Sequence, residues 1–469
     1  MNRLGVAAVI LATTLASARA AEQPPNIVLI LADDLGIGHV GCYGQRKIAT
    51  PQIDRLAAEG MRFTRFYSGA AVCAPARSVL MTGLHTGHTP VRNNGMARHL
   101  YDQDVTIAEV LKRAGYVTGG FGKWGLGGPE TPGVAVQQGF DEWFGQYSQV
   151  HAHFHYPAFL MHNREQVPLP ENAGRQRVRY APDVIHGRAL EFIRANRDRP
   201  FFAYLAYTLP HVELTVPASS RRPYEGRWPR IARQDPRPGY LGSDDAYAEF
   251  AGMVSHLDHQ VGEVLALLEE LGLDRRTIVL FSSDNGPQPG AWSDIFVEFF
   301  DGNGPFRGAK GSFYEGGIRA PLLARWPGVI APGSVSDHIG YFGDVMATLA
   351  ELAEATRYLP EHDGISFAPT LRGQPERQQR HEYLYWEADG THQDIVQQAV
   401  RLGDWKAVRP GSRAGWKLYD LAADPGEQRD IAAEHPDVLR QIEAIAAAAH
   451  RPERVYDPGQ REGVNDYVK

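Results

Sequence analysis

The sequence predicts an α/β fold with a large mixed sheet between helices and a smaller C-terminal α+β domain. Apolar runs of strand length alternate along the chain with amphipathic segments of helical period, which is the pattern of a layered α/β domain. Four of these runs are followed directly by polar or charged residues. A chain of 469 residues also exceeds the size of one small core, so a second, smaller unit is expected.

The N-terminus predicts a secretory signal peptide over residues 1–20. Arg3 gives a positively charged start, an apolar run follows over residues 4–15, and small residues around Ala20 form a cleavage site. No later segment reaches the roughly 18 apolar residues of a membrane helix. We therefore expect a periplasmic or secreted protein with no membrane span. The formal charge of −7 argues against nucleic acid as a partner.

The first predicted strand is Asn26–Ala32. Its continuous apolar and β-branched composition is typical of a strand that is buried on both faces of a largely parallel sheet. The same reasoning places further strands at 116–121, 201–207, 277–281 and 320–326, with amphipathic helices at 105–114 and 244–271.

Polar side chains follow four of these strands. They are Asp33 and Asp34 after the first, Lys123 after the second, His211 after the third, and Asp284 with Asn285 after the fourth. In open α/β sheets, ligands bind outside the carboxyl ends of the strands. A solvated turn explains any one of these ends, whereas four together favour a shared site.

Four of these residues form a set of oxygen donors that predicts a cation site. Asp33, Asp34, Asp284 and Asn285 offer carboxylate and amide oxygens, which select calcium or magnesium over zinc or copper. Calcium is preferred because it tolerates irregular geometry, and magnesium is the alternative. Carboxylates gathered without a cation would repel one another, which is a further reason to expect a metal.

A Cys-x-Pro-x-Arg pentad, Cys73 to Arg77, opens a short helical segment that ends at Gly83. A cysteine close to a proline is often only a small apolar residue in a turn. Cys42 is the other cysteine of the chain, so a single disulfide between Cys42 and Cys73 is the main alternative reading.

The pentad and the strand-end residues together resemble the type I sulfatases of the alkaline-phosphatase superfamily, in order and rough spacing from about residue 26 to 326. The resemblance implies an alkaline-phosphatase-like fold. It also implies that a formylglycine-generating enzyme oxidises Cys73 to formylglycine during maturation and that Arg77 holds the modified side chain. Asp33, Asp34, Asp284, Asn285 and an oxygen on residue 73 would then bind the metal.

Three further motifs carry the resemblance. A Gly-Lys-Trp motif gives Lys123, a Pro-His pair gives His211, and a late glycine-rich motif over 307–321 gives Lys310. In such an enzyme the two lysines neutralise the charge of the sulfate. A hydroxyl of the hydrated formylglycine attacks sulfur, and His211, alone or with Lys310, protonates the leaving alcohol.

One position departs from the family pattern. The family commonly carries a histidine directly after Gly-Lys-Trp, and Gly125 replaces it here. That histidine is implicated in the release of sulfate. We hypothesise that a histidine from the cluster at 151–155 reaches into the space beside Gly125, with His153 as the first choice, because histidine is the natural base near neutral pH.

The rest of the chain predicts a catalytic domain over 21–375 and a C-terminal subdomain over 376–469. Residues 221–238 are rich in arginine and proline and are expected to form an extended loop, either a solvated insertion or a basic rim. The subdomain is expected to hold short antiparallel strands and a helix, with Glu387, His392 and Gln397 as candidates for the cleft. In the subdomain, the predicted strands are 382–387, 399–402, 405–409 and 416–420, and the predicted helix is 436–449. Before the subdomain, a helix is predicted at 344–355 in the catalytic domain, and a link is predicted at 360–380.

These features predict hydrolysis of sulfate monoesters, with a sulfated carbohydrate or an aryl sulfate as substrate. One alternative keeps the fold and changes the ester, giving a phosphodiesterase or phosphonate monoester hydrolase. The other is a binding protein without catalytic activity, stabilised by calcium.

Overall fold

The structure is a computed structural model that describes residues 24–94, 98–234, 239–289, 295–389 and 395–452. The predicted signal peptide, residues 1–20, lies outside the described residues. No helix in the described part of the chain is long and apolar enough to cross a membrane.

The large sheet confirms the predicted α/β class. Among the described residues, ten strands are hydrogen-bonded in one mixed sheet, in the order β11-β2-β10-β9-β1-β8-β4-β5-β6-β7. The central strands β9, β1, β8, β4 and β5 run parallel, while β10 is antiparallel to β9 and β6 and β7 are antiparallel at the other edge. Their bounds are β1 Asn26–Ala32, β2 Met61–Phe63, β4 Val117–Lys123, β5 Glu142–Gln146, β6 Phe159–His162, β7 Glu165–Pro168, β8 Phe201–Ala206, β9 Thr277–Ser283, β10 Leu322–Arg325 and β11 Ser334–Ser336.

The first strand is buried on both faces, as its composition predicts. Ile27, Leu29 and Leu31 contribute to the apolar core on one face of the sheet. The alternate residues Val28, Ile30 and Ala32 contribute to the core on the opposite face. This two-sided burial explains the continuous apolar run, because neither face of the strand meets water.

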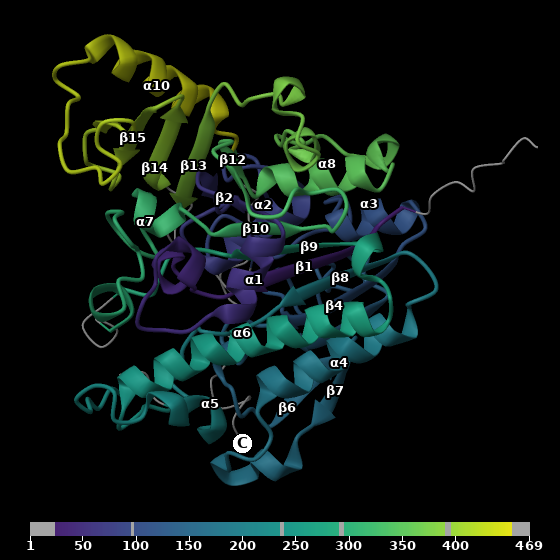
Figure 1. The fold of residues 1–469 in the computed structure, drawn as a ribbon. Helices are drawn as coiled ribbons and strands as arrows, with labels where there is room; N and C mark the ends of the chain where they lie inside the picture. The colour runs from purple at the N-terminus through teal and green to yellow at the C-terminus, as the bar shows by residue number, and fades with distance from the viewer. Residues whose placement is uncertain (1–23, 95–97, 235–238, 290–294, 390–394, 453–469) are drawn as a thin grey trace, which may run out of the picture.

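Helices cover both faces of the sheet (Figure 1). On one face lie α2 Cys73–Thr82, α3 Ile107–Arg113 and α8 Gly343–Leu352, and on the other α1 Pro51–Glu59, α4 Ala181–Ala195 and α6 Ala246–Glu270. Local signals fix their ends: Thr106 and Glu109 form a capping box at α3, and Gly83, with a φ of 71°, ends α2. The predicted helices at 105–114 and 244–271 correspond to α3 and α6.

The smaller C-terminal sheet is also present. In the described residues, four antiparallel strands pair in chain order, and α10 packs on them (Figure 1). The bounds are β13 Leu384–Asp389, β14 Ile395–Leu402, β15 Trp405–Arg409, β16 Lys417–Asp420 and α10 Pro436–Ala449. The boundary near residue 375 stays a prediction.

Short elements complete the fold. A two-stranded pairing joins β3 Phe66–Tyr67 to β12 Gly340–Tyr341, and three single-turn helices are α5 Ala218–Arg221, α7 Glu315–Ile318 and α9 Ala368–Leu371. Residues 221–234 therefore begin with a helical turn and are not wholly extended. Arg221 pairs there with Glu225 and Glu249, which favours a surface insertion over a basic rim.

Candidate active site

The parallel pairing of the central strands brings the predicted residues to one edge of the sheet. Beyond the last strand residues, the Asp284 N–H donates to the Ala32 carbonyl at 3.1 Å, and the Asp33 N–H donates to the Leu209 carbonyl at 3.1 Å. These bonds hold the ends of β9, β1 and β8 side by side. The shared site that the sequence predicts at the carboxyl edge is therefore assembled by the sheet itself.

The pentad opens helix α2 directly above this edge. Cys73 is the first residue of the helix, and its Sγ lies 3.4 Å from Oδ1 of Asp33. One turn later, the fully buried Arg77 donates from Nε and Nη2 to Oδ2 of Asp284, at 3.1 and 2.8 Å, and from Nη1 to the Lys123 carbonyl at 2.7 Å. A single guanidinium thus fixes α2 to the ends of β9 and β4.

Each of the three carboxylates has a cationic partner. Nζ of Lys123 lies 2.6 Å from Oδ2 of Asp33, and Nζ of Lys310 lies 2.7 Å from Oδ1 of Asp34. Burial by itself would raise the pKa of Asp33, but the positive charges of Lys123, Arg77 and Lys310 hold it well below its usual range. These cationic side chains offset part of the repulsion among the carboxylates, so repulsion by itself does not require a metal at this site.

Asn285 gives a separate indication that the cluster fits a metal ion. Its Nδ2 donates to Oδ1 of Asp34 at 2.7 Å, while its Oδ1 is buried and has no hydrogen-bond partner among the described residues. A buried acceptor without a partner costs about 1–3 kcal/mol unless a ligand satisfies it. Ligand atoms of Asp33, Asp34, Cys73 and His211 also lie within 4.8 Å of one another. This buried acidic and cysteine cluster fits a metal site.

His211 is buried beside the carboxylate cluster. Its Nδ1 donates to the carbonyl of Val212 at 2.6 Å, so Nε2 faces Oδ2 of Asp34 at 3.4 Å. Burial lowers the pKa of His211 to about 4, although the two nearby carboxylates act in the opposite direction. The ring is therefore neutral at physiological pH, with a lone pair on Nε2.

The histidines at 151, 153 and 155 separate into two groups. His151 bonds to the Phe159 carbonyl at 3.0 Å, and His155 bonds to Oγ1 of Thr215 at 3.0 Å, so both are tied into the surrounding loops. His153 instead stacks on His211, with ring centroids 4.3 Å apart. Its Nδ1 lies 2.6 Å from the hydroxyl of Tyr240. Of the three, His153 is the one that the fold places against a predicted site residue.

The hypothesis that His153 fills the space beside Gly125 is wrong. Gly125 has a φ of +76°, and a Cβ at this position would lie 2.0 Å from Nε2 of Gln149. The nearest atoms to that position all belong to Gln149. The sequence carries no motif that points to Gln149, since its place depends on how the loop after β5 crosses the end of β4.

The disulfide alternative is also excluded. Cys42 and Cys73 are both free thiols, and Cys42 is half-buried beside the start of α1. Burial and the Asp33 carboxylate raise the pKa of Cys73 to about 12, so the unmodified side chain stays a neutral thiol at physiological pH.

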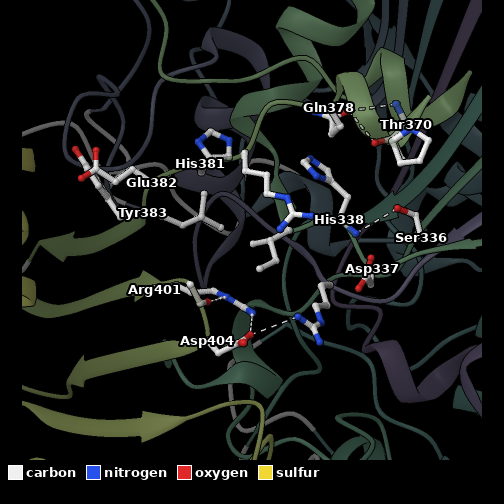
Figure 2. Close-up of a pocket in the computed structure, with 16 residues that line it drawn as sticks. Ser336, Asp337, His338, Thr370, Gln378, His381, Glu382, Tyr383, Arg401 and Asp404 are labelled. Atoms are coloured by element: carbon white, nitrogen blue, oxygen red, sulfur yellow. Dashed lines mark hydrogen bonds and ion pairs between the residues drawn. The ribbon is translucent and has the colours of Figure 1, made fainter. Parts of the chain in front are cut away.

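A separate cavity lies between the large sheet and the C-terminal sheet (Figure 2). Its lining residues come from the segments around β11, α9, β13 and β14, and none of the predicted site residues is among them. Of the candidates for the cleft, Gln397 donates to the carbonyl of Gly311 at 3.1 Å, next to Lys310. Glu387 is buried against Arg92, and His392 lies outside the described residues.

Comparison with known proteins agrees with this geometry. The model of the family described as Sulfatase matches residues 25–355, and that described as N-sulphoglucosamine sulphohydrolase, C-terminal, matches residues 308–447. Arylsulfatase A of Homo sapiens is 32% identical over 92% of this chain and 89% of its own length. N-acetylgalactosamine-6-O-sulfatase of Bacteroides thetaiotaomicron is 30% identical over 90% of this chain and 93% of its own length.

Among solved structures, the crystal structure of Ps i-CgsB superposes with a TM-score of 0.74 at 25% identity, over 91% of this chain and 93% of that one. The family match covers well over half of the chain and includes every residue of the site described above. Sulfatases are enzymes that hydrolyse sulfate esters. The chain therefore belongs to the type I sulfatase family, which is part of the alkaline-phosphatase superfamily.

Proposed function

We propose that this protein hydrolyses sulfate monoesters of carbohydrates or aryl alcohols, with formylglycine at position 73 and a bound calcium ion. The observation that carries the proposal is the convergence of Cys73, three carboxylates and three cationic side chains in one buried cluster at the carboxyl edge of the sheet. A sulfate monoester needs this combination, because its own negative oxygens repel a nucleophile.

Asp33, Asp34, Asp284, Asn285 and an oxygen on residue 73 would hold the cation. When bound, calcium would supply positive charge at the sulfate oxygens and act as a Lewis acid. Magnesium is the alternative for the same oxygen donors. The free Oδ1 of Asn285 supports its place among the ligands.

Formylglycine would supply a hydrated aldehyde whose hydroxyl groups serve as the nucleophile and then release sulfate. The chain's own residues prepare the site for it. Arg77 fixes the start of α2, and Lys123 and Lys310 neutralise the charge of the bound sulfate. A proton at Nε2 of His211 would pass to the oxygen of the leaving alcohol, and the negative charge of a bound sulfate would help this ring to hold that proton.

The proposal also includes export and maturation. We infer that residues 1–20 direct the chain to the periplasm or outside the cell, and that a formylglycine-generating enzyme modifies Cys73 on the way. The thiol is buried beside Asp33 in the folded protein, which supports modification before folding is complete.

The test combines peptide mass with turnover, using protein produced together with the maturation enzyme. The peptide that carries residue 73 should show the mass loss of a thiol replaced by an aldehyde, and the protein should hydrolyse 4-nitrophenyl sulfate. Cys73→Ser should remove both signals. Turnover of a phosphate diester or a phosphonate monoester above that of every sulfate ester would contradict the proposal.

His153 has its own test within this function. His153→Ala should lower kcat at least about tenfold, because the ring of His153 stacks on that of His211 and loss of a positioned acid or base typically costs more than this. The matched control is His162→Ala, at the end of β6, which should leave kcat unchanged. Equal kcat in wild type and His153→Ala would remove His153 from the mechanism.

A further inference from the structure

A small cavity lies beside the first turn of α2, next to the nucleophile position. Ala74, the residue after Cys73, forms part of its wall, together with Gly125, Tyr147 and Gln149. Arg98 and His99 line it as well. The cavity is therefore adjacent to the proposed reaction centre, and none of the residues assigned above to metal binding or to sulfate binding lines it.

Backbone pairing fixes two of the polar side chains at this cavity. The parallel ladder between β4 and β5 continues past both strands, with the Trp124 N–H bonded to the Gln146 carbonyl at 2.9 Å and the Gly125 N–H bonded to the Tyr147 carbonyl at 3.0 Å. Tyr147 and Gln149 thus lie beside Gly125, two residues after Lys123. Gly125 has a φ of +76°, which favours glycine, and a Cβ there would displace the Gln149 amide from its position 2.0 Å away.

Both side chains carry buried polar atoms that lack partners. The Tyr147 hydroxyl and the Gln149 Nε2 are inaccessible to solvent and make no hydrogen bond with any described residue. Leaving a buried donor or acceptor unpaired costs about 1–3 kcal/mol for each group. Both residues line the same cavity, which indicates a place where a ligand supplies the missing bonds.

The chemistry of the two groups selects the ligand. The Gln149 Nε2 can only donate, while the Tyr147 hydroxyl can donate and accept. A sugar hydroxyl can accept from the first and exchange a hydrogen bond with the second. Gly125, Gly127 and Gly128 add no side chain to the wall, and a Cβ at Gly128 would meet open space. The ring of an unsubstituted aryl sulfate offers no such hydroxyl.

We propose that Gln149 and Tyr147 form a subsite for a hydroxyl group of the leaving alcohol, so that the preferred substrate is a sulfated carbohydrate and not an aryl sulfate. This inference rests on the proposed sulfatase function. A site built to hydrogen-bond a hydroxyl group discriminates strongly against an analogue that lacks it, because its own polar groups then remain unpaired.

The kinetic test compares sulfated monosaccharides with 4-nitrophenyl sulfate. Wild type should have a higher kcat/KM for at least one sugar in a panel of galactose, glucose and N-acetylhexosamine sulfates. Gln149→Ala and Tyr147→Phe should lower the ratio of kcat/KM for that sugar to kcat/KM for 4-nitrophenyl sulfate by about 10- to 100-fold. Gln166→Ala, on the exposed strand β7, is the control and should leave the ratio unchanged. An unchanged ratio in both cavity variants, or a preference of the wild type for the aryl ester, would overturn the subsite.

A binding measurement separates this proposal from the proposed function. Calorimetry with Cys73→Ser should show tighter binding of a sugar sulfate than of 4-nitrophenyl sulfate, and Gln149→Ala in that background should remove the difference. If wild type hydrolyses no sulfate ester, the proposed function fails, whereas the calorimetry still decides the subsite. Equal binding of the two esters to Cys73→Ser would overturn the subsite even if aryl sulfates are hydrolysed.

Discussion

At the scale of single residues, the site depends on a few side chains that each bond to several elements. Arg77 contacts Asp284 after β9 and the carbonyl of Lys123 on β4. Its replacement would leave buried carboxylate charge unpaired, which is strongly destabilising. Gly125 acts in the opposite way, since it contributes by having no side chain and so admits Gln149. One position is constrained by its contacts and the other by its lack of a Cβ.

Asn285 provides a residue-scale test of the cation. Added calcium should raise the melting temperature of wild type, because a ligand that binds only the folded state stabilises it in proportion to the logarithm of its concentration. Asn285→Ala removes the free Oδ1, so its melting temperature should rise less at the same calcium concentration. Chelator treatment of wild type should reverse the rise.

Asn303→Ala is the matched control, because its amide donates to the Phe306 and Gly308 carbonyls in a loop outside the cluster. It should respond to calcium as wild type does. An equal calcium response in Asn285→Ala and wild type would exclude Asn285 from the ligand set.

At the scale of elements, helix packing beneath the sheet depends on a buried carboxylate. Oδ1 of Asp258, on α6, accepts from the backbone N–H groups of Gln52 and Ile53 in the first turn of α1, at 2.9 and 2.8 Å. These groups have no partner within α1, so Asp258 serves as their cap from another helix. Burial nevertheless raises the pKa of Asp258 to about 7, well above the usual range of an aspartate.

This shift predicts a pH dependence of stability. Between about pH 4 and pH 7 the folded state binds more protons at Asp258 than the unfolded state, so the free energy of unfolding falls as the pH rises through this range. The total loss is on the order of 4 kcal/mol at most. Asp258→Asn keeps an acceptor oxygen and cannot ionise, so denaturant unfolding should show a flatter profile and greater stability than wild type at pH 8. Parallel profiles for the two proteins would show that Asp258 does not titrate in this range.

At the scale of the whole molecule, buried charges join the two sheets. Lys406 on β15 is fully buried, and its Nζ lies 2.8 Å from Oε1 of Glu315 at α7 and 3.0 Å from Oε1 of Glu427. Arg319 also pairs with Glu315, and Arg401 on β14 bonds to the hydroxyl of Tyr67 on β3. The C-terminal sheet is thus fixed to the segment that follows Lys310. Because the C-terminal sheet is fixed so close to Lys310, we infer that this sheet helps to hold Lys310 in place.

Lys406 tests this connection. Lys406→Met leaves the buried Glu427 carboxylate without its cation and Glu315 with only Arg319 of its two cationic partners, which should lower the free energy of unfolding by about 3–5 kcal/mol. Lys417→Met, on the neighbouring strand β16 and only partly buried, is the control and should have little effect. The measurement is equilibrium denaturation followed by tryptophan fluorescence. Equal stability of the two variants would show that the buried network does not hold the sheets together.

The sequence predicts the centre of this fold better than its edges. The apolar runs of β1, β8 and β9 identify these strands because both faces are buried. The edge strands β6 and β7 are short and partly exposed, and no periodic pattern marks them. The loop after β5 was also beyond prediction, so Gln149 and Tyr147 could not be placed near Gly125 from their order in the chain.

The sequence by itself determined which chemical groups the protein brings to its site. The pentad at Cys73, the acids after β1 and β9 and the lysine motifs are local patterns, which can be recognised from the order of the residues alone. The tertiary structure alone decided their partners: the amide of Asn285 meets a carboxylate 251 residues away, and Lys310 meets the same side chain. Such contacts depend on strand order and loop paths, which are set by the packing of the whole sheet and not by neighbouring residues.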